Sequence, residues 1–482
     1  MKKNIILIMA AAMIGTVSCN LLNVENKNSI YGDGYWSAKG DVESYVTGIY
    51  TQFRNLCNRT LFLEDRGDSF VAGSEGGPSN PWAQVLTSQT GYSWASHYQV
   101  IQNCNMVLKH APQVHFSINS ERDNLLAQAY AIRAYCYFYL LRVWGDVPLE
   151  TEPTESAKKE KLGRAPATEV LALAISDAER AVELFSADWV AGKGKASKMG
   201  TYALLADMYL WKAKVMGGTD EDLRTVIRYA DLASAKTSLE SNFTDIFSTK
   251  NGKEIIWSIY FKYPEKVGHY SYSLKPKTVT VEKAKNADQI PSSTAATHTY
   301  SPSPEIIAML NRYRGDVRAP ASYVVGYSAD GGVISTYDNK MNGTKTETNR
   351  VYDNDIILYR HAEMLLFKAE AHAALGEIDQ AVSALDQVRN RAGIGAYTGA
   401  RDKTTVEREI LEERAREFYL ELKRWPDLIR FHSEGVIDIY QVVPNLKKKA
   451  DAGVRMPLYL DIPLADIALN PQLTHTAGYE NL

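Results

Sequence analysis

The sequence predicts a mostly α-helical fold in which paired helices form a scaffold and an irregular, loop-rich part packs on it. Apolar residues recur at three- and four-residue steps mainly within 94–236 and 354–430, the period of a helix with one buried face. The stretches 58–93 and 237–353 lack that period and carry many loop-forming residues, which is typical of loops and short strands. These two patterns together predict the fold class.

The composition is that of a globular protein. Of the 482 residues, 45% are hydrophobic and 23% are charged, close to the averages for soluble domains. This excludes a disordered chain, a collagen-like chain and a protein with many membrane spans. Lys and Arg number 54 against 57 Asp and Glu, so no basic surplus favours nucleic acid as a partner. Tyr is abundant, at 29 residues, and its apolar ring with a polar tip suits binding surfaces as well as cores.

Residues 1–18 are predicted to be a lipoprotein signal peptide. Two lysines precede an uncharged apolar run over 5–17, which has the length of a signal h-region and is short for a bilayer span. The small residue Ser18 stands before Cys19, as in bacterial lipoprotein signals. We therefore expect lipidation of Cys19 and cleavage before it, with the acyl chains as membrane anchor. An ordinary secretory signal with a chance cysteine is the alternative.

The body is expected to follow a polar, Gly-containing tether over 19–40 and to form a single domain over 41–482. Helical periodicity predicts helices over 41–57, 94–110, 121–144, 167–186, 198–216, 220–236, 354–375, 377–392 and 404–424. The last of these is expected to end at Trp425-Pro426. A strand is predicted at Glu254–Tyr260 and a short helix at 303–312. The tail over 436–482 is expected to be irregular and to pack back on the body.

Small residues at the contacts between helices indicate repeats. Ala371, Leu375-Gly376, Ala381 and Ala384-Leu385 closely resemble the tetratricopeptide (TPR) pattern, in which two antiparallel helices approach closely. Looser versions occur within 203–233 and 127–181. We expect about four TPR-like helix pairs forming a superhelical scaffold. A generic bundle with Ala-rich contacts is the alternative.

Few residues suggest catalysis or metal binding. Cys57, Cys104 and Cys136 fit buried thiols that act as small hydrophobes, and no CxxC pair predicts a zinc or redox site. The chain has no P-loop, GxSxG or HExxH motif, so we expect no cofactor and no metal. A calcium site around Asp65 and Asp68 stays open, because loop carboxylates can bind that ion.

One row of acidic residues could supply a catalytic pair of carboxylates. Glu413, Glu417 and Glu421 recur at four-residue steps and would share one helix face. Glycoside hydrolysis needs two carboxylates across a cleft, whereas a row on one helix is more typical of a salt-bridged surface. We therefore expect no enzyme. Arg133, among Tyr and Leu, is expected to anchor carboxylates or carbonyls with its planar fork.

Motifs along most of the chain resemble the SusD/RagB family. They are Arg133–Leu140, Trp144–Leu149, Ala369–Ala371, Val388–Gly393, Ile410–Arg414, Glu417-Phe418 with Glu421, Arg424–Leu428, Ile462-Pro463, Asn470–Thr474 and Gly478-Tyr479. Each motif is weak, but their shared order is specific. The sequence departs from the family at 474–478, where a Gln-Asn-Pro element is common, and in a tether without the usual acidic, Pro-containing start.

The resemblance implies a binding protein rather than a catalyst. Members are surface-exposed outer-membrane lipoproteins of Bacteroidota that capture oligomeric nutrients, most often oligosaccharides, and deliver them to a SusC-like TonB-dependent transporter. The TPR-like half usually faces the transporter, and the irregular half usually holds the ligand. The RagB branch handles oligopeptides, which stays an alternative. A TPR scaffold without a small ligand and a surface glycoside hydrolase are lesser alternatives.

Aromatic residues flanked by polar ones are the candidate ligand contacts. A sugar ring can place its C–H face on an aromatic plane and its hydroxyls against polar side chains. The candidates for a sugar are Asn80, Trp82, Gln84, Tyr92, Tyr263, Tyr270, Tyr272 and Tyr300. For a peptide, the mixed charges of Asp65, Arg66 and Asp68 in the loop 64–80 are added. Each residue alone fits packing better, but the set predicts that some of them line the site.

Overall fold

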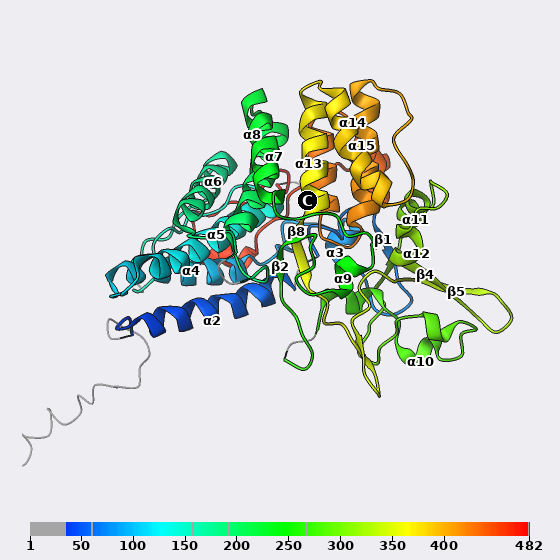
Figure 1. The fold of residues 1–482 in the computed structure, drawn as a ribbon, viewed down its shortest axis with the longest axis horizontal. Coiled ribbons are helices and arrows are strands. Elements are labelled where there is room, and N and C mark those ends of the chain that lie inside the picture. Colours follow the sequence, from blue (N-terminus) through cyan, green and yellow to red (C-terminus); the bar gives the residue numbers. More distant parts are fainter. Residues whose placement is uncertain (1–34, 59–60, 157–158, 190–191, 266–267, 481) are drawn as a thin grey trace, which may run out of the picture.

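The computed structural model describes residues 35–58, 61–156, 159–189, 192–265, 268–480 and 482. Helices dominate, and short strands and loops gather beside them (Figure 1). The predicted fold class is confirmed. Cys19 and the signal peptide lie outside the described residues.

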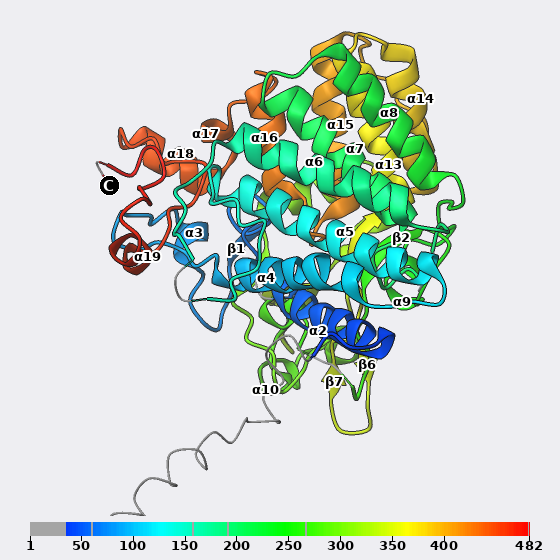
Figure 2. The ribbon, with the colours of Figure 1, turned by 90° about the vertical axis from the view of Figure 1, so that its left-hand side faces the viewer.

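The N-terminal half is a set of packed helices. Its helices are α2 (Lys39–Cys57), α4 (Ala95–His110), α5 (Asn119–Trp144), α6 (Ala167–Leu184), α7 (Lys198–Val215) and α8 (Asp220–Ser234). Consecutive helices pack as pairs, α5 with α6 and α7 with α8. Figure 2 shows these helices layered across one face of the molecule. The pairing follows the prediction, because small residues such as Ala178 and Ala203 are fully buried where helices meet.

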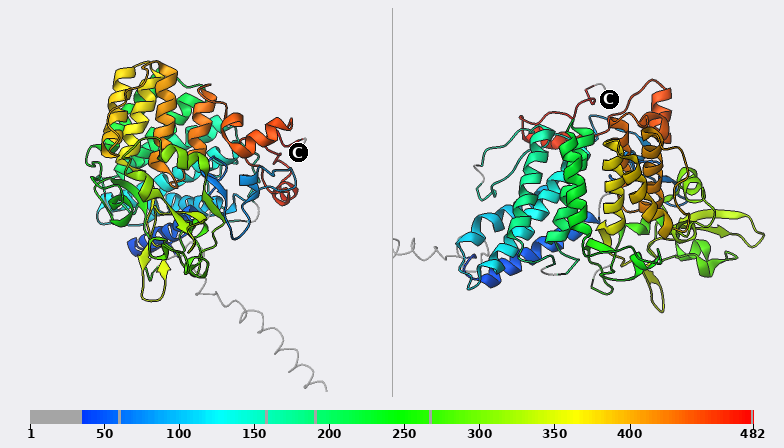
Figure 3. Two further views of the ribbon diagram at one scale, coloured as in Figure 1. Left: turned by 90° about the vertical axis from the view of Figure 1, so that its right-hand side faces the viewer. Right: turned by 45° about the horizontal axis from the view of Figure 1, so that its top comes forward.

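The second helical block follows the irregular part of the chain. It contains α13 (His361–Ala374), α14 (Ile378–Arg391), α15 (Lys403–Phe418) and α16 (Arg424–Ser433). Helix α13 packs on α8 and on its own partner α14, so the two blocks form one continuous scaffold (Figure 3). Gly376 joins α13 to α14 with a φ of +79°, a conformation that glycine adopts without steric cost.

The irregular part contains short antiparallel strand pairs. The pairs are β1 (Phe70–Ala72) with β3 (Tyr300–Pro302), β2 (Ile255–Ile259) with β8 (Ile356–Arg360), β4 (Tyr323–Tyr327) with β5 (Val333–Asp338), and β6 (Thr344–Lys345) with β7 (Arg350–Val351). Short helices lie between them: α3 (Asn80–Ala83), α9 (Asp245–Ser248), α10 (Thr278–Val281), α11 (Pro304–Leu310) and α12 (Arg318–Ser322). Two of the pairings, β1 with β3 and β2 with β8, join segments far apart in sequence.

The C-terminal tail packs back on the body, as expected. It contains α17 (Ile439–Val442), α18 (Pro444–Asp451) and α19 (Leu464–Leu469). Leu460, Ile462 and Tyr479 are fully buried. The Leu460 backbone N–H donates to the carbonyl of Val143 at 2.8 Å, which fixes the tail against the end of α5.

Two predicted motif roles are confirmed. Arg133 donates from Nε and Nη2 to the two carboxylate oxygens of Asp177, both at 2.7 Å, so its fork ties α5 to α6. Helix α5 ends at Trp144, whose indole is fully buried and donates to the carbonyl of Tyr92 at 3.1 Å. The three described cysteines are free and buried.

Two predicted helix boundaries are wrong. Residues 356–360 form strand β8 rather than the start of a helix, because their uninterrupted apolar run is buried against β2. Helix α15 ends at Phe418, since Leu420 and Leu422 adopt left-handed φ values of +64° and +61°. Trp425 and Pro426 therefore lie in the first turn of α16, which begins at Arg424, instead of ending α15, and Pro is well tolerated in a first helical turn.

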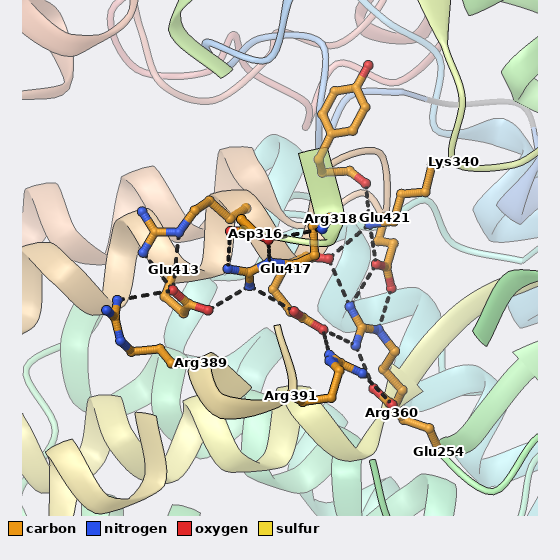
Figure 4. Close-up of polar contacts among 12 residues, drawn as sticks. Glu254, Asp316, Arg318, Lys340, Arg360, Arg389, Arg391, Glu413, Glu417 and Glu421 are labelled. Carbon is orange, nitrogen blue, oxygen red and sulfur yellow. Dashed lines mark hydrogen bonds and ion pairs between the residues drawn. The ribbon is translucent and has the colours of Figure 1, made fainter. Parts of the chain in front are cut away.

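The expected salt-bridged surface of acids is also wrong, because Glu413, Glu417 and Glu421 are buried. They belong to an ionic core (Figure 4). This core comprises Arg318, Lys340, Arg360, Arg389, Arg391 and Arg416 with Glu254, Asp316, Glu409, Glu413, Glu417 and Glu421. None of these side chains is more than 5% exposed. The ionic core joins the irregular part to α14 and α15.

Candidate functional site

Strand pairing brings two predicted aromatic residues together. Tyr300 on β3 lies opposite Ala72 on β1, and its ring centre is 6.3 Å from that of Trp82. The Tyr300 ring also stacks on Phe70, 5.2 Å away. We call the surface formed by Asn80, Trp82 and Tyr300 the Trp82 face. Asn80 is exposed on it, Trp82 is half-buried and Tyr300 is buried.

The local sequence holds Trp82 in place. Ser79 caps α3, because its hydroxyl accepts a hydrogen bond from the Trp82 backbone N–H at 3.1 Å, as N-cap residues do. The Trp82 indole donates to the carbonyl of Phe70 at 3.0 Å. From the tail, Asn445 donates to the Trp82 carbonyl at 2.8 Å. The ring is therefore fixed from β1, and the backbone that carries it is fixed from α18 and by the cap of its own helix, which suits a rigid stacking surface.

Asp65 lies beneath the Trp82 face. One carboxylate oxygen accepts a hydrogen bond from the Ser79 hydroxyl at 2.7 Å, and the other is buried without a hydrogen-bond partner among the described residues. Burial raises the pKa of Asp65 to about 6, because a desolvated carboxylate is disfavoured in its charged form. Asp65 thus supports the cap of α3 from inside.

Arg66, Asp68 and Gln84 are also internal. Arg66 donates to the carbonyls of Pro457 and Leu458 at 2.7 and 2.6 Å, and to Gln84 at 3.1 Å. Asp68 accepts two bonds from Arg424, at 2.6 and 2.7 Å. These side chains connect the loop to the C-terminal segments instead of facing solvent, where a ligand would contact them. In the ranges that the structure describes, no group of three or more His, Cys, Asp or Glu could hold a metal ion.

The remaining predicted tyrosines lie apart from the Trp82–Tyr300 ring contact. Tyr263 is 46% exposed. Tyr270 is buried and its hydroxyl donates to the carbonyl of Leu420 at 2.6 Å. Tyr272 is half-buried edge-on against Tyr352, 4.5 Å away. Tyr92 is half-buried against Phe62. Of these four, Tyr263 offers the most open ring for a ligand.

A cavity of about 500 Å³ opens between α4, residues within 148–154 and 161–162, and α19 with the residues that follow it up to 473. We call it the α4–α19 cavity. Its lining includes Trp94, Tyr98, Gln102, Glu150, Asp466 and Asn470. Sequence reasoning missed it because the three walls come from distant segments. The signal available was the spacing of Ala95, Tyr98 and Gln102, which places a small, an aromatic and an amide side chain on one face of α4.

No helix among the described ranges has the length and apolarity that a membrane crossing needs.

Comparisons with known proteins give a consistent result. A family model described as SusD family matches residues 209–479, and one described as starch-binding associating with outer membrane matches 25–210. SusD-like protein P38 of Formosa agariphila is 28% identical over 466 residues, covering 86% of this chain and 88% of that protein. The starch-binding protein SusD of Bacteroides thetaiotaomicron is 32% identical over 155 residues, 31% of this chain and 26% of that one. The structure of B. fragilis NanU superposes with a TM-score of 0.79 at 25% identity, covering 95% of this chain and all of that one.

Proposed function

The chain belongs to the SusD family, and on this premise we propose that it captures oligosaccharides at the cell surface. It is a lipoprotein of the outer membrane, held through Cys19, and it faces the cell exterior. It passes its ligand to a SusC-like TonB-dependent transporter. Support for the location comes from the match to a family described as associating with the outer membrane. Support for the ligand class comes from the starch-binding protein SusD among its relatives.

The Trp82 face is the observation that carries the ligand assignment. A half-buried indole, fixed by its hydrogen bond to Phe70 and by two hydrogen bonds to the Trp82 backbone, lies beside the exposed residue Asn80. Sugars need this combination of a plane for C–H groups and a polar edge for hydroxyls. We propose Trp82 and Asn80 as ligand contacts, with Tyr300 as the buried ring beside Trp82 and Tyr263 as an outlying aromatic. The rest of the chain acts as scaffold.

The buried acids support a binding role over hydrolysis. Glu413 and Glu417 are each held by arginines at 3.0 Å or less, and neither side chain is exposed. A glycosidase pair must instead flank an open cleft. The acidic residues that most resembled a catalytic pair therefore form buried ion pairs that hold the scaffold together.

Calorimetry tests the proposal with the purified protein in detergent. One titration uses a pool of plant, fungal and host oligosaccharides, and another uses a tryptic digest of protein. We expect heat with the sugar pool and a loss of affinity of about tenfold or more in Trp82→Ala, since a truncated Trp anchor commonly costs 2 kcal/mol or more. Heat with the peptide pool alone would move the protein to the oligopeptide alternative.

Trp189→Ala is the matched control. Trp189 is also half-buried, and its indole also donates to a backbone carbonyl, that of Ile256 at 3.2 Å. It lies between α6 and α7, so its loss should leave the affinity unchanged. Equal losses of affinity in both variants would indicate that the substitutions act by impairing folding. Association with the transporter is tested separately, by affinity purification of the tagged protein from outer membranes.

A further inference from the structure

We propose that the α4–α19 cavity is a second binding site, which takes a neutral sugar residue. The inference rests on the proposed function, since it assigns a further subsite for the same class of ligand. At about 500 Å³, the cavity falls within the range of small-molecule sites, which are mostly apolar with a few placed polar groups.

Helix α4 supplies a rigid apolar wall. Ala95, Tyr98 and Gln102 lie on one helical face toward the cavity. The Tyr98 hydroxyl donates to the carbonyl of Pro148 at 2.8 Å, which fixes the ring and ties it to the opposite wall. Ala95 is exposed, and its short side chain leaves room at the entrance. A fixed aromatic ring beside open space suits the C–H face of a sugar.

The polar groups of the cavity are mainly acceptors. Glu150 and Asp466 contribute carboxylates from opposite walls, and one oxygen of Glu150 is already paired with the Lys159 ammonium group. The Asn470 amide nitrogen donates to the carbonyl of Leu162 at 2.8 Å, and its oxygen accepts from the Gln472 backbone N–H at 3.1 Å, so the oxygen has one further lone pair for a donor. Burial raises the pKa of Asp466. A ligand rich in hydroxyl donors matches this set, and sugar hydroxyls bonded to carboxylates make charge-assisted hydrogen bonds.

The charge balance of the cavity favours a neutral ligand. Lys161 is the cationic residue in the lining, and its ammonium group already donates to the carbonyl of Leu469. Lys159 pairs with Glu150 and offsets its charge, whereas the Asp466 carboxylate would repel the acid group of a uronic acid or a sulfate ester. A peptide would bring as many carbonyl acceptors as N–H donors, which matches an acceptor-rich wall poorly.

The cavity and the Trp82 face are built from different elements at the same end of the molecule. Figure 2 shows α3, which carries Trp82, on the same side as α19. Two subsites on one body can engage one oligomer, and the second contact then becomes intramolecular. An oligosaccharide long enough to reach both subsites should therefore bind more tightly than a short one. The gain in affinity should exceed what additional contacts at the Trp82 face alone would give.

The test uses short and long neutral oligosaccharides drawn from the pool that binds the wild type. Ala95→Trp fills the entrance, and Asp466→Asn removes one carboxylate without changing its shape. The control is Ala172→Trp, which places the same ring at an exposed position of α6. Thermal unfolding of each variant checks that it folds. We expect about tenfold weaker binding of the long sugars in Ala95→Trp and a smaller loss in Asp466→Asn, with no change in the control.

The outcomes separate the two proposals. If Trp82→Ala abolishes binding while Ala95→Trp and Asp466→Asn behave like the control, the second site is wrong and the proposed function stands. If the wild type binds no oligosaccharide, the proposed function fails and the inference fails with it. If acidic oligosaccharides bind as tightly as neutral ones and Ala95→Trp weakens them equally, the assignment to a neutral sugar is overturned.

Discussion

Replacing Glu417 by Gln should destabilise the protein more than any surface substitution. One Glu417 oxygen accepts hydrogen bonds from Arg360, at 2.5 Å, and from Arg391, while the other accepts from Arg318 at 3.0 Å. Burial opposes ionisation of this carboxyl, but the three guanidinium groups outweigh it and hold the pKa of Glu417 well below its ordinary value. The carboxylate is therefore charged at every pH at which the protein is studied.

The magnitude follows from what remains after the substitution. Three buried guanidinium groups would lose a shared counter-charge, and breaking a buried ion pair by removing one partner costs about 3–5 kcal/mol. With about 2.1 cal/mol/K of unfolding entropy per residue, a chain of 482 residues has an entropy of about 1 kcal/mol/K. Each kcal/mol then lowers the melting temperature by about 1 °C, so we expect a decrease of about 3–5 °C.

The assay is differential scanning calorimetry of wild type, Glu417→Gln and a surface control. Glu183→Gln removes a carboxylate that is 64% exposed and pairs with Arg180 one turn away. Such pairs contribute about 0.2–1 kcal/mol, so the control should stay within about 1 °C of wild type. If Glu417→Gln melted with the control, the ionic core would contribute nothing through this carboxylate, and the argument from buried charge would be refuted.

Three further predictions concern the supports of the fold. The pKa of Asp65 is about 6 in the folded protein, against 3.8 for an ordinary Asp. The folded state therefore keeps a proton that the unfolded state loses, and the free energy of unfolding should fall by up to about 3 kcal/mol as the pH rises between these two values. Asp65→Asn should remove that decrease in urea titrations at pH 4 and pH 7, and an unchanged decrease would contradict the assignment. Asp177→Asn leaves Arg133 buried without its carboxylate and should lower stability by about 3–5 kcal/mol, measured by urea unfolding; a loss below 1 kcal/mol would count against it. Gly376→Ala places a side chain on a residue with a left-handed backbone conformation, where no atom lies within 4 Å of the new Cβ. Backbone strain alone should therefore lower the stability by about 1–2 kcal/mol. A melting temperature equal to that of the wild type would refute that cost.

Most helices could be predicted from the sequence because their periodicity is local. The helix over 167–186 is one case, since its buried Val170, Ala174 and Ala181 recur at the helical period. The break after Phe418 could not be predicted, because Leu420 and Leu422 are ordinary leucines in a helical pattern. Tertiary contacts hold the backbone of Leu420, whose N–H donates to Glu64 at 3.4 Å. The Leu420 carbonyl accepts from Tyr270, 150 residues earlier in the chain.

The candidate site was only partly predictable. Composition marked Trp82 and Tyr300 as candidates, but only the pairing of β1 with β3 brings their rings together. The burial of the charged loop residues could not be predicted, for a physical reason. Arg66 and Asp68 look like surface residues by type, yet both find hydrogen-bond partners in segments about 360–390 positions away. Burial of a charge depends on such partners, and a single sequence does not show them.

The motifs that revealed the family are the ones least able to reveal the ligand. Arg389, Arg391, Glu413 and Glu417 belong to the motifs by which the chain resembles the SusD/RagB family, and all four lie in the ionic core. A buried carboxylate with three arginine partners tolerates little change, whatever ligand the protein binds. The ligand contacts proposed on the Trp82 face and in the α4–α19 cavity carry no such constraint. Differences in ligand between members of this fold should therefore be sought at these surfaces, with the ionic core unchanged beneath them.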